Sequence, residues 1–95
     1  MGAYVIPDIG VTDPERYESY KALSGPSLEA FGGTFVSRGG PHEVLEGDWE
    51  PRRVVIIAFE SVAKAKAWYH SDAYQAAAKI RHETAETNMV IVEGT

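Results

Sequence analysis

The sequence predicts an α+β domain of ferredoxin-like type, a two-layer sandwich in which helices cover an antiparallel four-stranded sheet (βαββαβ). The first observation is the order of hydrophobic patterns along the chain: strand, helix, strands, helix, strand. The second is the run of six apolar residues at 54–59, which is typical of a strand buried on both faces. The third is the length of 95 residues, which allows one domain, residues 1–95, with too few helices to cover both sheet faces. We therefore expect a partner subunit on the second face.

The N-terminal half is expected to contain one strand and one long helix. Residues 3–9 have the pattern of a strand, and Pro7 should weaken its pairing or cause a bulge because proline donates no backbone hydrogen bond. Asp13 and Pro14 predict a helix start, since aspartate accepts hydrogen bonds from free amides and proline fits the first turn. Pro26 should kink this helix or divide it into two.

The C-terminal half is expected to contain a hairpin, a central strand, broken helices and a last strand. Residues 34–37 and 43–46 are predicted as the two arms of the hairpin. The central strand should cover 53–59, and Ser61 should begin a helix that breaks and restarts near residue 71. A final strand is expected at 89–93.

Composition argues against several classes of function. A net charge of −5 argues against nucleic-acid or anionic-membrane partners, because phosphate binding requires clustered Lys and Arg. The absence of cysteine excludes a thiol nucleophile and a cysteine metal site, and fits a cytoplasmic location. The string at 82–86 has one histidine where zinc proteases have two, so we expect no metal and no cofactor. We see no signal peptide and no apolar stretch that approaches about 18 residues.

A set of short motifs resembles a known family over nearly the whole chain. The motifs are Asp13-Pro14 with Tyr17 and Tyr20, Gly32-Gly33, Gly39-Gly40, Glu46-Gly47-Asp48-Trp49, Arg53 with Val55-Ile56, Phe59 with Ser61, Ala67-Trp68-Tyr69 with Ser71, Tyr74-Gln75, Arg81, and Val92-Glu93-Gly94. In combination they resemble the domain-of-unknown-function family 1330. The resemblance implies a dimeric α+β barrel, in which two ferredoxin-like subunits join sheet to sheet. Relatives by fold include cofactor-free monooxygenases, muconolactone-type isomerases, haem-binding enzymes and ligand-binding domains, so the fold does not decide the function.

Charged residues of two predicted strands are the first candidates for a site. Alternation places Tyr4, Ile6 and Asp8 on one face of the first strand, which we expect to border a polar cleft between sheet and helices. Asp8 is a candidate general base or substrate anchor; alternatively it is solvated or paired with an arginine. Arg52 and Arg53 point to opposite sides of their strand. One of them could bind a ligand carboxylate, or both could form surface or interface ion pairs.

Aromatic residues and one histidine complete the candidates. Trp49 in a turn is interpreted as a pocket cover or as a contact across a dimer interface. Trp68 and Tyr74 could line an aromatic pocket, although their helical spacing also suits the core. His70, at a helix break, is a candidate general acid or base if it faces the cleft; otherwise it is exposed.

The sequence thus predicts a homodimer that binds a small anionic or aromatic metabolite in a cleft of the barrel. One hypothesis adds cofactor-free acid–base chemistry by Asp8 or His70; the alternative is a non-catalytic structural or regulatory homodimer. The candidate ligand-binding residues are Tyr4, Trp49, Arg52, Arg53, Trp68 and Tyr74.

Overall fold

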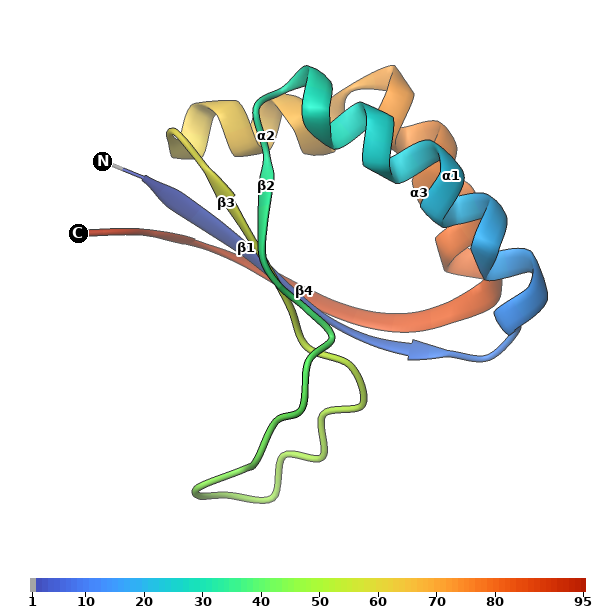
Figure 1. The fold of residues 1–95 in the computed structure, drawn as a ribbon, viewed down its shortest axis with the longest axis vertical. Helices are drawn as coiled ribbons and strands as arrows, with labels where there is room; N and C mark the ends of the chain where they lie inside the picture. Colours follow the sequence, from blue (N-terminus) through green and yellow to red (C-terminus); the bar gives the residue numbers. More distant parts are fainter. Residues whose placement is uncertain (1) are drawn as a thin grey trace.

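The computed structural model describes residues 2–95, which form four strands and three helices. In chain order these are β1 (Ala3–Val11), α1 (Pro14–Ala30), β2 (Thr34–Arg38), β3 (Val55–Phe59), α2 (Val62–His70), α3 (Asp72–Thr84) and β4 (Ala85–Glu93). The strands form one antiparallel sheet in the order β2-β3-β1-β4. The helices all lie on one side of it (Figure 1). The predicted ferredoxin-like fold is confirmed.

Each predicted helix start is capped as expected. The side chains of Asp13, Ser61 and Ser71 each accept a hydrogen bond from the backbone N–H three residues later, at 3.2, 3.1 and 3.1 Å. Helix α1 runs through Pro26 without a break, so the division into two helices is excluded. Figure 1 shows this helix curving over the sheet. Within residues 2–95, no helix is long and apolar enough to cross a membrane.

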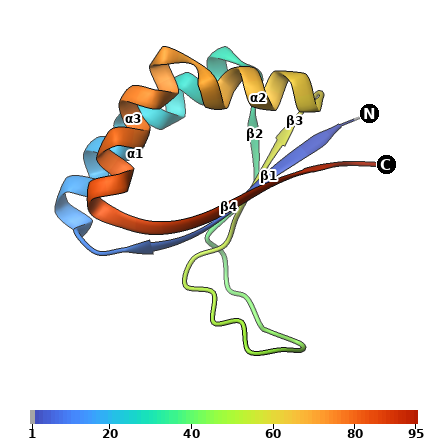
Figure 2. The ribbon, with the colours of Figure 1, turned by 180° about the vertical axis from the view of Figure 1, so that it is seen from behind.

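The pairing between the central strands β1 and β3 is interrupted at Pro7, as the sequence predicts. Strand β1 pairs with β3 from Ala3 to Val5, and the same register resumes only at an isolated bridge between Asp8 and Val54. On its other side, β1 pairs with β4 over nine positions, from Ala3 opposite Glu93 to Val11 opposite Ala85. The termini therefore lie side by side (Figure 2).

Among the predicted strands, those at 43–46 and 89–93 differ most from the structure. Residues 43–46 form no strand, because β2 pairs directly with β3 and leaves residues 39–54 as a long connection. This connection extends away from the helices (Figures 1 and 2). Strand β4 begins at Ala85 rather than at residue 89, because its polar first half lies opposite the end of β1.

The two faces of the sheet differ in their cover. Side chains of the inner face, among them Val5, Ile9 and Ile57, are buried against the helices. The outer face bears apolar side chains that no element of residues 2–95 covers: Tyr4, Val36, Val90 and Val92 are 39%, 60%, 56% and 46% exposed. The core thus occupies one side of the sheet.

Candidate functional site

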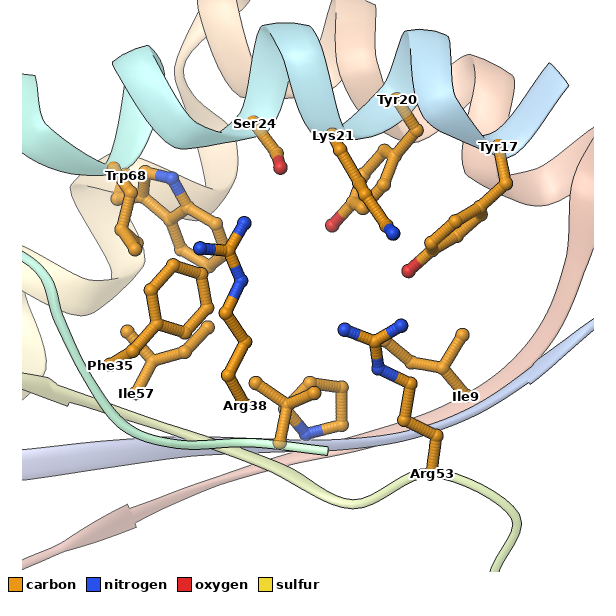
Figure 3. Close-up of a pocket in the computed structure, with 13 residues that line it drawn as sticks. Ile9, Tyr17, Tyr20, Lys21, Ser24, Phe35, Arg38, Arg53, Ile57 and Trp68 are labelled. Atoms are coloured by element: carbon orange, nitrogen blue, oxygen red, sulfur yellow. The ribbon is translucent and has the colours of Figure 1, made fainter. Parts of the chain in front are cut away.

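A cavity lies between helix α1 and the inner face of the sheet (Figure 3). Its hollow measures about 450 Å³ including the open mouth, and about 40 Å³ of it is accessible to the centre of a water molecule. It is lined by Pro7, Ile9, Tyr17, Tyr20, Lys21, Ser24, Leu28, Phe35, Arg38, Arg53, Val55, Ile57 and Trp68. The deep part therefore holds a few waters or a small group of a ligand whose remainder extends through the mouth.

Three basic side chains line this cavity, which we call the cationic cavity. Figure 3 shows the ends of Lys21, Arg38 and Arg53 directed toward its centre. Of the residues between 2 and 95 that line it, none is Asp or Glu. The ammonium group of Lys21 does contact the carboxylate of Glu18, at 2.9 Å and largely in solvent. The two guanidinium groups have no carboxylate within 4 Å among the described residues.

A β-bulge directs Arg38 into the cavity. In the β2–β3 ladder Phe35 lies opposite Ile57, while Ser37 lies opposite Ile56, so Val36 is an extra residue on β2. The extra residue reverses the alternation, and Arg38 consequently lies on the buried face with Val55. The guanidinium of Arg38 stands over the Phe35 ring, 4.4 Å from its centroid, which is a favourable cation–π distance.

The side chain of Arg53 packs closely over Gly39. A Cβ atom on Gly39 would lie 2.7 Å from Nε of Arg53, and this glycine has a φ of +77°, which other residues adopt only under strain. The Nε atom of Arg53 is buried and has no hydrogen-bond partner in the described structure. A buried N–H without a partner costs free energy, so the Nε–H of Arg53 is an unsatisfied donor within the described residues.

Hydroxyl groups from helix α1 face the two arginines. Tyr17, Tyr20 and Ser24 recur on one face of the helix and direct their oxygens into the hollow (Figure 3). Burial raises the pKa of Tyr17, and the positive charge of Arg53 lowers it by a smaller amount. Burial also raises the pKa of Tyr20 far above its ordinary value, so both phenols are neutral hydrogen-bond donors at neutral pH.

The structure brings two of the predicted ligand-binding residues, Arg53 and Trp68, into this cavity. The indole N–H of Trp68 donates to the hydroxyl of Ser27 at 3.2 Å, so its ring serves as an apolar wall. Tyr74 is fully buried one layer behind the cavity, where its ring packs on Trp68 with centroids 4.0 Å apart. Its hydroxyl lies 3.0 Å from that of Tyr20.

Asp8 lies on the opposite face of the sheet, so the expectation that it borders the cleft under the helices is wrong. It accepts hydrogen bonds from the backbone N–H groups of Arg52 and Arg53, at 3.0 and 3.4 Å, and from the indole of Trp49 at 3.1 Å. Desolvation raises the pKa of Asp8, but these bonds together with the Arg52 charge outweigh it and lower the pKa below its usual value. Within the described part of the chain Asp8 forms no ion pair with a guanidinium group, and the Arg52 side chain instead meets Glu86 at 3.2 Å.

The remaining candidates lie apart from the cationic cavity. Tyr4 is on the outer face of the sheet, as is a shallow groove beside Asp8 and Trp49 that measures about 730 Å³ including its open mouth. His70 is exposed at the end of α2 and borders a separate hollow against Met89 that measures about 580 Å³ including its open mouth. Hence Asp8 and His70 cannot act on one bound molecule in the cationic cavity. Within residues 2–95 no three His, Asp or Glu side chains are placed to bind a metal ion together.

Several residues of the cavity were not predicted from the sequence. The predicted hairpin arms at 34–37 and 43–46 leave Arg38 in the connection between them, and the spacing of Tyr17 and Tyr20 predicts only one face of a helix. A usable signal was nevertheless present, because this face bears hydroxyl groups at Tyr17, Tyr20 and Ser24 where an ordinary core helix has aliphatic groups.

Sequence comparison now places the chain in a family. Residues 2–95 match the family model described as "Domain of unknown function (DUF1330)". The chain belongs to the DUF1330 family. No curated protein sequence matches this DUF1330 chain.

Solved structures of the same fold cover almost the whole DUF1330 chain. The RPA0582 protein of unknown function from Rhodopseudomonas palustris is 22% identical, with a TM-score of 0.78 over 99% of this chain and 82% of that one. SnoaB, a cofactor-independent oxygenase from Streptomyces nogalater, is 14% identical, with a TM-score of 0.70 over 99% and 93% of the two chains. A dimeric ferredoxin-like protein of unknown function from Jannaschia sp. is 13% identical, with a TM-score of 0.68 over 99% and 100%. At these identities the similarity shows the fold alone.

Proposed function

We propose that this protein is a homodimer whose subunits each bind a small organic anion in the cationic cavity. The observation that supports the proposal is the set of Lys21, Arg38 and Arg53 around one hollow that no carboxylate lines. Three positive charges around one hollow repel one another unless an anion compensates them, and planar guanidinium groups favour carboxylates and enolates. The walls formed by Phe35 and Trp68 suit a planar or aromatic ligand body.

The uncovered face of the sheet supports the homodimer. The exposed apolar side chains of β1, β2 and β4 lie on that face, and a second copy of the chain offers a matching apolar surface by symmetry. The DUF1330 chain also shares its fold with a protein described as dimeric. In such a dimer the cavities remain under the helices and stay open to ligands.

Anion binding is tested by calorimetry with benzoate as the probe. We expect wild-type protein to bind benzoate and Arg53→Met to weaken binding about tenfold or more, because hydrogen bonds to charged groups contribute about 1.5–3 kcal/mol. Arg52→Met is the matched control, since Arg52 lies on the other face of the sheet beside Glu86. Equal affinity of the two variants would contradict the assignment of the cavity.

Cofactor-free chemistry is the second candidate, favoured by the fold shared with a cofactor-independent oxygenase. The ligand that co-purifies with the protein would be identified by mass spectrometry and then incubated in air with fresh protein. Conversion that Arg53→Met abolishes would support an enzyme, whereas an unchanged ligand would support a binding protein.

A further inference from the structure

Arg81 is a buried cation outside the cationic cavity. It lies in the last turn of α3 and is only 4% exposed, and none of the ion pairs among residues 2–95 includes it. The C-terminal end of a helix favours a positive charge, which explains how Arg81 is tolerated there without a carboxylate. Its Nε–H donates a hydrogen bond to the hydroxyl oxygen of Tyr74 at 3.2 Å.

The Arg81–Tyr74 hydrogen bond determines which hydroxyl donates in the hydrogen bond between Tyr74 and Tyr20. The hydroxyls of Tyr74 and Tyr20 lie 3.0 Å apart, and either could donate. If Tyr20 donated, the proton of Tyr74 would have no acceptor among the described residues, in a side chain that is fully buried. An unmade hydrogen bond at such a site is costly, so Tyr74 donates to Tyr20.

The proton of Tyr20 is therefore free for an acceptor in the cavity. Apart from Tyr74, the Tyr20 hydroxyl has no hydrogen-bond partner within residues 2–95, and it lines the hollow opposite Arg53 (Figure 3). Burial raises the pKa of Tyr20 far above its ordinary value, which keeps the phenol protonated and able to donate. A hydroxyl at the end of a hydrogen-bond chain that a buried cation polarises donates a stronger hydrogen bond than an isolated hydroxyl does.

We propose that Arg81 and Tyr74 act as positioning residues that hold Tyr20 as a donor to a single oxyanion, the deprotonated oxygen of a phenol or enol, in the cationic cavity. This inference rests on the proposed function and specifies its ligand class. A single oxygen atom suits one directed hydroxyl donor with guanidinium charge beside it, the arrangement that stabilises an oxyanion.

The probe is 4-nitrophenol, whose phenolate is coloured, so its absorbance reports both binding and ionisation. We expect wild-type protein to bind the phenolate and to lower the pH at which the bound probe ionises relative to the free probe. Tyr20→Phe and Tyr74→Phe should weaken phenolate binding about tenfold and move that ionisation back toward the free probe. Arg81→Met should also weaken phenolate binding and raise the pH at which the bound probe ionises. Arg81→Lys should give values between those of the wild type and Arg81→Met. The matched control is Tyr69→Phe, because Tyr69 lines the other hollow.

The outcomes separate this inference from the proposed function. If neither benzoate nor 4-nitrophenolate binds, both are overturned. If benzoate binds but 4-nitrophenolate does not, or if Tyr20→Phe and Tyr74→Phe leave its affinity and ionisation unchanged, the oxyanion inference alone is overturned. Circular dichroism identifies variants that fail to fold; Tyr74→Phe keeps the ring and its packing, and therefore decides the question if Arg81→Met unfolds.

Discussion

The carboxylate of Asp8 anchors the β2–β3 connection to the sheet. Its two oxygens accept three hydrogen bonds, two from backbone N–H groups at the end of the connection, just before β3, and one from Trp49. Directly beside them, the Ile9 N–H donates to the Arg53 carbonyl at 2.8 Å. The contact holds the backbone of Arg52 and Arg53 at a bend before β3, where the Arg52 side chain meets Glu86 and the Arg53 side chain lines the cavity. Asp8 thus positions a cavity residue without itself facing the cavity.

The charge of Asp8 should make the stability of this protein depend on acid pH. Because the folded-state pKa of Asp8 is lowered, its stabilisation is present above the unfolded pKa of about 3.9 and is lost as pH falls through the folded value. Between about pH 5 and pH 2, we expect the free energy of unfolding to fall less in Asp8→Asn than in the wild type. Urea unfolding at fixed protein concentration measures this difference. Asp48→Asn, an exposed carboxyl of the same connection, should retain the wild-type slope. Equal slopes for the two variants would exclude this role of Asp8.

At the scale of elements, the connection between β2 and β3 decides which side chains reach the ligand. The bulge at Val36 turns Arg38 inward, and the positive φ of Gly39 lets the chain leave the strand close over Arg53. The ends of the Arg38 and Arg53 side chains then both point into the cavity (Figure 3). Irregular backbone next to a regular sheet is a common way to direct functional side chains.

Gly39→Ala should weaken ligand binding as well as stability. The new methyl group would lie 2.7 Å from Nε of Arg53, so this side chain must move, and the positive φ adds about 1 kcal/mol of strain. Gly47→Ala is the matched control, because its φ is +91° and no atom lies within 4 Å of the new methyl. Thermal unfolding should show a loss for both variants, whereas calorimetry should show weaker benzoate binding for Gly39→Ala alone. Unchanged binding in Gly39→Ala would mean that the position of Arg53 is unimportant.

The sequence predicts the regular elements better than the site, for physical reasons. Periodicity and capping residues are local, so the helix starts and the lapse at Pro7 follow from the chain itself. Alternation says which residues share a strand face, but not which face the helices cover, and Asp8 was therefore assigned to the wrong side. The bulge at Val36 depends on the register of two strands, which no local pattern specifies. Arg38 consequently could not be placed.

On the scale of the whole molecule, the fold is a thin slab with two unlike faces. Its Cα atoms extend 35 × 33 × 17 Å, which leaves room for one sheet and one layer of helices. Three of the nine basic residues of this acidic chain line one cavity, while apolar side chains remain exposed on the outer face. An apolar sheet face left in water favours association, and stacking two such faces about 10 Å apart would bury both.

Substitutions at two neighbouring residues of β3 should distinguish an effect on folding from an effect on dimerisation. Ile57 faces the helices and is 5% exposed, whereas Ile56 lies on the outer face and is only partly buried within one chain. Ile57→Asp should abolish folding, because a buried carboxylate without a partner costs about 3 kcal/mol or more. Ile56→Asp should keep the near-ultraviolet circular dichroism of folded tyrosine and tryptophan, yet sediment as a monomer at micromolar concentration where the wild type sediments as a dimer. A monomeric wild type, or a dimeric Ile56→Asp, would exclude the outer face as the interface, and the apolar side chains of β1, β2 and β4 would then need another partner.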